Sequence, residues 1–178
     1  MKTNSMTEAA ARWIMGRRSI RLYKPGTVSE GAITRMLEAA MAAPSAVEKD
    51  PWRFVVIQER STLERLAPAL SNGELLLQAG TAIAVCGDLE AAHDRQLSYL
   101  LQDCSAAIEN LLLSAHSQGL GACWLGVHPR EKRIEALRSV LGLPETVMPV
   151  ACIAVGLPGE QKDARTRYRR EYVHREKW

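Results

Sequence analysis

Apolar residues recur along this chain in two alternating patterns, one typical of helices and one typical of buried strands. Steps of three and four residues are clearest over residues 95–118 and predict a long central helix, which Gly119 ends. The same spacing predicts shorter helices over residues 7–17, 30–43, 61–70 and 130–141. Short continuous apolar runs predict four strands, over residues 54–58, 81–88, 122–127 and 150–156.

The second of these helices has recognisable ends. Thr27 and Glu30 have the T-x-x-E spacing of a capping box, in which two side chains bond the first free N–H groups of a helix. The helix is expected to stop before Pro44, because the residue that precedes a proline avoids the helical conformation.

Strands alternate with helices, and the strands are apolar at nearly every position. Such strands are typical of a sheet that helices cover on both faces. The chain of 178 residues has the usual length of one domain, and no repeat, low-complexity block or linker interrupts it. We therefore expect one domain over residues 1–178, with a basic C-terminal arm over residues 162–178.

Composition narrows the classes of function. The formal net charge of +3 is small, which argues against a general binder of nucleic acids or membrane surfaces. No apolar run reaches the roughly 18–20 residues that cross a bilayer, and the first residues lack the apolar core of a signal peptide. The cytoplasm is therefore the expected location, with no nucleic-acid or membrane partner.

The four cysteines and four histidines are scattered along the chain. No two cysteines have the C-x-x-C spacing of a metal or redox site, and there is no HExxH motif. We expect reduced thiols that pack as small apolar side chains, and no metal. Ser45 and His128 stand alone as a candidate nucleophile and base, so the residues indicate no catalytic dyad or triad.

Three arginines, Arg17, Arg18 and Arg21, stand within five residues, with Ser19 between them. A solvated turn explains such a cluster. An anion site explains it equally well, because guanidinium groups and a serine hydroxyl donate several hydrogen bonds to the oxygens of one phosphate. The local sequence leaves both interpretations open.

Two further segments have both a structural and a ligand-binding interpretation. The glycine-rich run over residues 119–126 lacks the spacing of a GxGxxG or P-loop motif. It is either a helix end followed by a strand, or a place where Gly126 lets the backbone approach a flat ligand. The loop over residues 42–52 is either a simple connection or, because its side chains are small, a surface for a planar ring.

In their order and spacing, four segments resemble the FMN-dependent nitroreductase family. They are RRSIR near the N-terminus, APSAxxxxPWxFVV, GLGACWLGV after the long helix, and VACIAVGLPGEQK before the basic arm. The resemblance covers nearly the whole chain. It implies an α+β fold with a mixed β-sheet flanked by helices, and an intertwined homodimer with one FMN in each interface.

The resemblance also implies which residues contact the phosphate end of the cofactor. Arg17, Arg18 and Ser19 match the start of the phosphate and ribityl site. Arg165 and Arg167 match a C-terminal basic pair that closes over the phosphate.

Around the flavin ring, the implied contacts come from both subunits. Arg21 matches a basic position near flavin N1 and O2, where a cation would stabilise the negative charge of the reduced ring. Asn72 matches an asparagine that bonds the polar edge of the ring, and Leu125 and Gly126 match a stretch whose backbone N–H faces N5. A loop that packs on the ring from the partner subunit is matched by Pro44, Ser45 and Ala46.

Glu48 and Asp50 depart from the family pattern, which usually has asparagine and glutamine at these positions. A carboxylate near the ring would disfavour its reduced anionic form and lower the flavin potential. The two side chains could equally point into solvent. The departure bears on the range of substrates more than on the binding of FMN.

The implied activity is that of an FMN-dependent NAD(P)H oxidoreductase with ping-pong kinetics. NAD(P)H reduces the flavin and leaves, and a small-molecule acceptor such as a nitroaromatic, a quinone or an activated alkene then binds in the same place. No protein residue is expected to be catalytic. Two alternatives remain: related flavin chemistry on the same fold, such as reductive dehalogenation or dehydrogenation, and a basic binding module with no flavin.

Overall fold

A computed structural model describes residues 5–178. Its α-helices are α1 (Ser5–Gly16), α2 (Glu30–Met41), α3 (Arg60–Leu66), α4 (Glu74–Ala79), α5 (Leu97–Ser117) and α6 (Glu131–Leu141). Its strands are β1 (Tyr23–Lys24), β2 (Trp52–Ile57), β3 (Thr81–Asp88), β4 (Gly121–Gly126) and β5 (Val147–Pro158). Among the described residues, no helix has both the length and the apolar character that crossing a membrane requires.

The five strands form one sheet in the order β1-β5-β3-β2, and β4 also pairs with β5. Every pairing between these strands is antiparallel, and Ser19 adds one parallel bridge to Ala122 on β4. β5 is the central strand, because it pairs with β1, β3 and β4. The α+β fold with a sheet flanked by helices is therefore confirmed, but the sheet is antiparallel rather than mixed, because the one parallel contact is the isolated bridge of Ser19.

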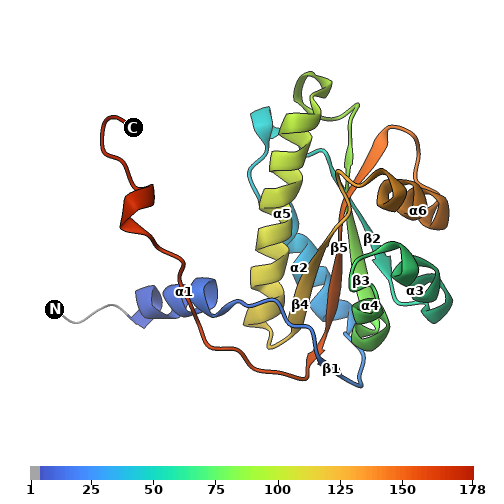
Figure 1. Cartoon of the computed structure of the whole chain (residues 1–178), viewed down its shortest axis with the longest axis horizontal. Helices are drawn as coiled ribbons and strands as arrows, with labels where there is room; N and C mark the ends of the chain where they lie inside the picture. The colour runs from blue at the N-terminus through green and yellow to red at the C-terminus, as the bar shows by residue number, and fades with distance from the viewer. Residues whose placement is uncertain (1–4) are drawn as a thin grey trace.

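Helices cover both faces of the sheet (Figure 1). α2 and α5 pack on one face, over a core that includes Ile83 and Val85 of β3. α3, α4 and α6 pack on the other face, where Ala82 and Ala84 of the same strand contribute to a second core. Because the strand is buried on both sides, its sequence is apolar at successive positions rather than at alternate ones.

Most of the predicted elements are present, with ends that differ by a few residues. α5 ends at Ser117, and Gly119 follows with a φ of +73°, in the left-handed region that a glycine after a helix adopts. α2 ends at Met41, before Pro44 as predicted.

The predicted capping box is wrong. Ser29, not Thr27, caps α2, and its hydroxyl accepts a hydrogen bond from the N–H of Ala32 at 3.3 Å. Thr27 and Ser29 both carry a hydroxyl that can cap a helix. Ser29 is the cap because the helix begins at the next residue, Glu30. The apolar pattern predicts neither β1 nor α4, because these elements are too short to show the spacing of apolar residues that is typical of a strand or a helix.

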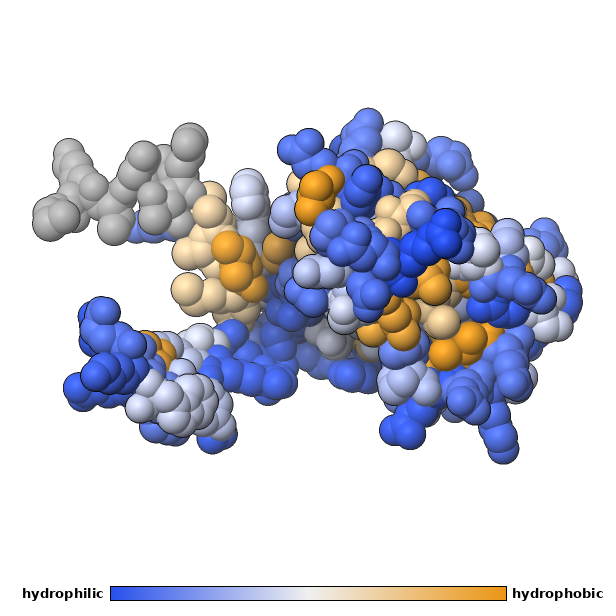
Figure 2. Space-filling model, turned by 90° about the horizontal axis from the view of Figure 1, so that it is seen from above, coloured by the Kyte–Doolittle hydropathy of each residue, from blue (hydrophilic) through white to orange (hydrophobic). Residues whose placement is uncertain are grey.

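α1 and the C-terminal arm project from the same side of the core (Figures 1 and 2). On α1, the side chains of Trp13, Ile14 and Met15 are between 49% and 64% exposed. In the C-terminal arm, Tyr168 and Tyr172 are also exposed. Apolar side chains gathered on a projecting segment are typical of a contact with another chain.

The cysteines are buried and form no disulfide within residues 5–178, as predicted. Burial raises the pKa of the Cys86, Cys104 and Cys152 thiols to about 12. These thiols are therefore protonated and unreactive near neutral pH.

Candidate functional site

Segments from the two ends of the chain run side by side. β1 pairs with the end of β5, and the N–H of Gly159 donates to the carbonyl of Leu22 at 2.7 Å. Further along, the N–H of Arg165 donates to the carbonyl of Met15 at 3.2 Å. Main-chain hydrogen bonds thus join two segments that lie near opposite ends of the sequence.

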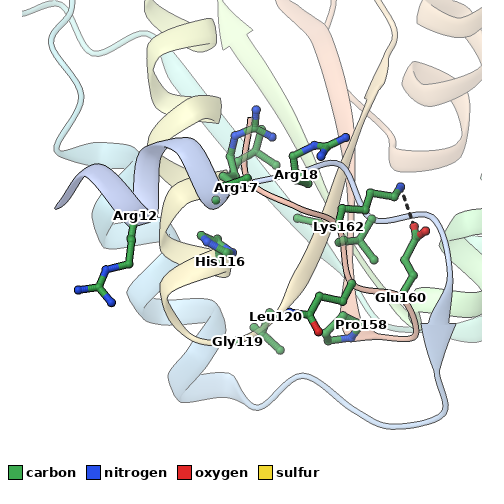
Figure 3. A pocket seen from close by; sticks show the side chains of 15 residues that line it. Arg12, Arg17, Arg18, His116, Gly119, Leu120, Pro158, Glu160 and Lys162 are labelled. Carbon is green, nitrogen blue, oxygen red and sulfur yellow. Dashed lines mark ion pairs between the residues drawn. The ribbon is translucent and has the colours of Figure 1, made fainter. Parts of the chain in front are cut away.

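Glu160 and Lys162 fasten these segments with their side chains (Figure 3). One carboxylate oxygen of Glu160 accepts hydrogen bonds from the N–H groups of Arg21, at 2.6 Å, and Leu22, at 3.3 Å. The Lys162 ammonium lies 2.9 Å from that oxygen and donates to the carbonyl of Ser19 at 2.9 Å. The hydrogen bonds from the Arg21 main chain and from Lys162 hold the pKa of Glu160 below its ordinary value.

The fastened segments surround a cationic hollow of about 310 Å³, which we call the anion pocket. Its lining consists of Ile14, Arg17, Arg18, Ser19, Arg165 and Arg167. Five of the twelve residues expected to contact the cofactor therefore line one pocket, although they come from opposite ends of the chain.

The positive charge of the anion pocket is only partly compensated. Arg17 pairs with Glu109 of α5 at 3.0 Å, and Arg18 donates to a main-chain carbonyl of the C-terminal arm. Within residues 5–178, Arg165 and Arg167 form no ion pair. Repulsion from Arg18 and then from Arg167 lowers the pKa of Arg165. A multiply charged anion would relieve this repulsion, so the donors of the pocket fit a phosphate ester.

A second cavity, of about 420 Å³, shares Arg17 and Arg18 with the anion pocket (Figure 3). The apolar part of its wall includes Ile20, Leu112, Leu120 and Ala122. Both arginines are only partly exposed, and they lie between two hollows. A solvated turn does not account for this placement.

Residues expected around the flavin ring lie along β4. Arg21 follows Ile20, whose N–H donates to the carbonyl of Ala122 on β4 at 3.0 Å. Burial raises the pKa of the neighbouring Cys123 thiol, and the Arg21 cation lowers it by a smaller amount. The side chain of Leu125 is buried, so only its main chain is available to a ligand. At Gly126 the space is open, because an added side chain would meet nothing within 4 Å.

Asn72 lies in the turn before α4, with its backbone in the left-handed region at a φ of +59°. Its neighbour Ser71 accepts a hydrogen bond from Arg133 of α6. The same guanidinium donates to the carbonyl of Gly126 at 2.7 Å. The structure therefore brings the turn of Asn72 to the end of β4.

The loop of Pro44, Ser45 and Ala46 lies elsewhere in the same chain. The N–H of Ala46 donates to the carboxylate of Asp103, which is buried in the first half of α5, at 2.9 Å. α1, which leads to the arginines, lies at the other end of α5 (Figure 1). Within one chain, this loop does not join the other residues of the expected site.

The two acidic residues of this loop differ in their surroundings. Asp50 accepts a hydrogen bond from the Ser45 hydroxyl at 2.5 Å, and the N–H of Asp50 donates back to that hydroxyl at 3.0 Å. Both partners of these hydrogen bonds, Asp50 and Ser45, lie within the loop, so Asp50 stabilises the conformation of the loop. Glu48 is exposed, and its backbone is in the left-handed region at a φ of +53°.

No pattern in the sequence singles out Glu160, Lys162 or Arg133. Glu160 and Lys162 bond main-chain groups 139 and 143 residues away, and Arg133 bonds the hydroxyl of Ser71, 62 residues away, besides the nearby carbonyl of Gly126. Partners at such separations leave no local pattern. For Glu160 and Lys162, the one available sequence signal is the pair of opposite charges in GEQK, directly after an apolar strand.

The sequence model of the nitroreductase family matches residues 14–73 and 69–157, so this chain belongs to the nitroreductase family. A relative from Archaeoglobus fulgidus, provisionally named NADH dehydrogenase/NAD(P)H nitroreductase, is 41% identical over 96% of this chain and 99% of its own length. A crystal structure from Parabacteroides distasonis with the same provisional name shares 36% identity and a TM-score of 0.89, over 99% of this chain and 100% of that one. A provisionally named nitroreductase from Desulfovibrio desulfuricans, solved in complex with FMN, shares 31% identity and a TM-score of 0.81 over 99% of both chains.

Proposed function

We propose that this chain is an FMN-dependent NAD(P)H oxidoreductase that reduces a small-molecule acceptor such as a nitroaromatic or a quinone. The anion pocket carries the proposal, because four arginines and a serine converge there in a member of the nitroreductase family. FMN ends in a phosphate, and the chain has no dinucleotide motif. The relatives named for NAD(P)H nitroreductase activity, and the one solved with FMN, point to the same function.

The chain's own residues would bind and orient the cofactor. Arg17, Arg18, Ser19, Arg165 and Arg167 hold the phosphate through charge-assisted hydrogen bonds. Because Glu160 and Lys162 fasten the two segments that carry these donors, the pocket is formed before the anion arrives.

The flavin ring would lie along the end of β4. The main chain of Leu125 and Gly126 faces the ring, and the open space at Gly126 leaves room for that close approach. Asn72 bonds the polar edge of the ring, and the Arg21 cation favours the negative charge that reduction adds. Bound FMN supplies the redox chemistry between NAD(P)H and the acceptor, so no protein residue needs to act as an acid or a nucleophile.

A homodimer would complete the site. Pro44, Ser45 and Ala46 lie at the other end of α5 from the arginines, so a second copy has to supply them. The exposed apolar side chains of α1 and the projecting C-terminal arm offer the surface for such a contact. In this proposal, residues 1–178 form one domain of each protomer and work in the cytoplasm.

We further propose ping-pong kinetics, because one surface over the ring serves NAD(P)H and the acceptor in turn. Related flavin chemistry, such as reductive dehalogenation or dehydrogenation, would use the same residues and differ only in the acceptor. A screen of acceptors against the reduced enzyme separates these possibilities.

Identification of the bound cofactor tests the proposal most directly. The protein should purify yellow, and heat should release about one FMN per chain, which chromatography distinguishes from FAD. Recovery of FAD, or of no flavin even after incubation with FMN, would contradict the proposal and favour a binding module without flavin.

A further inference from the structure

Arg133 joins two segments that are distant in the sequence. It lies in the first turn of α6, is partly buried, and uses two nitrogens of its guanidinium. Nη1 donates to the carbonyl of Gly126 at 2.7 Å, and Nη2 donates to the hydroxyl of Ser71. One side chain therefore fixes the end of β4 and the turn before α4 relative to each other.

We propose that Arg133 is a positioning residue of the flavin site. It would keep the main chain at Gly126 and the turn that carries Asn72 in the geometry that binds the ring. The inference rests on the proposed FMN function and extends it to a residue that does not itself contact the cofactor.

Both segments need such a restraint. Gly126 is the last residue of β4 and pairs with Ala151 of β5, but it has no side chain, and nothing lies within 4 Å of the place where one would be, so no side-chain packing adds to that pairing. Asn72 has a φ of +59°, a conformation that costs energy for a residue other than glycine and persists where its surroundings hold it. The bond from Arg133 to Ser71 lies directly beside this residue.

Arginine suits this position better than any other side chain. Its planar fork presents several N–H donors in fixed directions, so it can satisfy two acceptors on different segments at once. Within residues 5–178, Arg133 forms no ion pair, so both bonds go to uncharged oxygens of the site. A lysine keeps the charge but lacks the fork.

A matched comparison tests the proposal. Arg138 lies on the same helix and also donates to a main-chain carbonyl, that of Pro144. Arg133→Met therefore removes two guanidinium bonds of α6 and Arg138→Met removes one, but only the first variant loses bonds to the expected flavin site. The measurements are the dissociation constant for FMN added to the full-length apoprotein, the midpoint potential of the holoenzyme, and the thermal unfolding temperature of each variant.

Arg133→Met should weaken FMN binding about tenfold or more, since two hydrogen bonds from a charged donor are lost. Ser71→Ala, which removes one bond, should weaken it by a smaller factor, and Arg133→Lys should fall between wild type and Arg133→Met. Arg138→Met should lower the unfolding temperature and leave the dissociation constant and the potential unchanged.

Three results would overturn the inference. The first is an Arg133→Met variant with the FMN affinity and midpoint potential of wild type. The second is an equal loss of affinity in Arg133→Met and Arg138→Met. The third is full affinity in Arg133→Lys, because the charge of residue 133 would then be sufficient. If wild type itself binds no FMN, the proposed function fails together with this inference. If wild type binds FMN and Arg133→Met binds it with the same affinity and potential, this inference fails and the proposed function stands.

Discussion

The main-chain N–H of Arg21 donates to the carboxylate of Glu160 at 2.6 Å, and this bond joins the two ends of the chain at the anion pocket. Four guanidinium groups line that pocket, and those of Arg18 and Arg167 repel that of Arg165. The carboxylate of Glu160, with the ammonium of Lys162, holds the segments together against this repulsion.

Glu160→Gln should lower the thermal unfolding temperature at neutral pH by about 2–4 °C, the shift expected for about 1 kcal/mol in a chain of this size. The folded protein lowers the pKa of Glu160, so its contribution is fully present above the unfolded value of about 4.3. That contribution is lost as the pH falls through the lower folded pKa. Unfolding curves of both proteins between neutral and acidic pH should therefore converge in acid. Glu64→Gln, which removes an exposed pair with Arg60, is the control and should change little.

Arg165→Ala should weaken FMN binding about tenfold or more without destabilising the apoprotein. The substitution removes a donor to the phosphate, but it also relieves the repulsion from Arg18 and Arg167. Titration with FMN and thermal unfolding of the apoprotein measure the two effects separately. Arg175→Ala, further along the arm, should bind FMN like wild type. Equal weakening in the two variants would mean that the arm attracts anions only through its overall charge.

Glu48→Gln should raise the midpoint potential of bound FMN, because a nearby carboxylate opposes the negative charge that reduction adds. For a separation of about 8 Å and an effective dielectric constant near 20, the shift is on the order of tens of millivolts, and exposure to solvent reduces it. The shift should be larger at low salt. Potentiometry at two ionic strengths, with Glu135→Gln of α6 as the control, measures it. Equal potentials at low salt would place Glu48 away from the ring.

Trp13→Glu should weaken the homodimer and the binding of FMN together. The side chain of Trp13 is 53% exposed on α1, and a charge there would be buried against the partner. Light scattering coupled to size-exclusion chromatography should show a shift toward monomer at low protein concentration. Lys132→Glu on α6 should leave the dimer intact. A monomeric variant that keeps full affinity for FMN would show that one chain suffices for the site.

Initial rates should follow ping-pong kinetics. At several fixed concentrations of the acceptor, double-reciprocal plots against NAD(P)H should give parallel lines, because the two substrates use one surface in turn. Intersecting lines would require a ternary complex and a separate binding place for the acceptor.

The sequence predicts most of the fold because burial leaves a local pattern. β3 was predicted over its whole length, since packing on both faces makes successive residues apolar. α5 was predicted within two residues at its start and one at its end, since it buries one face along 21 residues. β1, with two residues, has too few positions to show any period.

The site is harder to read from the sequence than the fold. The arginine cluster suggests an anion, but a solvated turn has the same local sequence. The pairing of β1 with the end of β5, together with the bond from the N–H of Arg165 to Met15, brings Arg165 and Arg167 to Arg17 and Arg18. The bonds of Glu160 and one of the two bonds of Arg133 go to main-chain groups, which every residue has, so these partners carry no identifying side chain. The other bond of Arg133 goes to the hydroxyl of Ser71, which is 62 residues away.

Because the C-terminal arm is exposed, its removal should release the cofactor without unfolding the protein. Arg165 and Arg167 lie beyond β5, and no described strand or α-helix follows them. A protease that cuts between Lys162 and Arg165 would remove half of the pocket's arginines and leave the sheet and both of its cores in place. Limited digestion should therefore give a colourless protein with nearly unchanged circular dichroism.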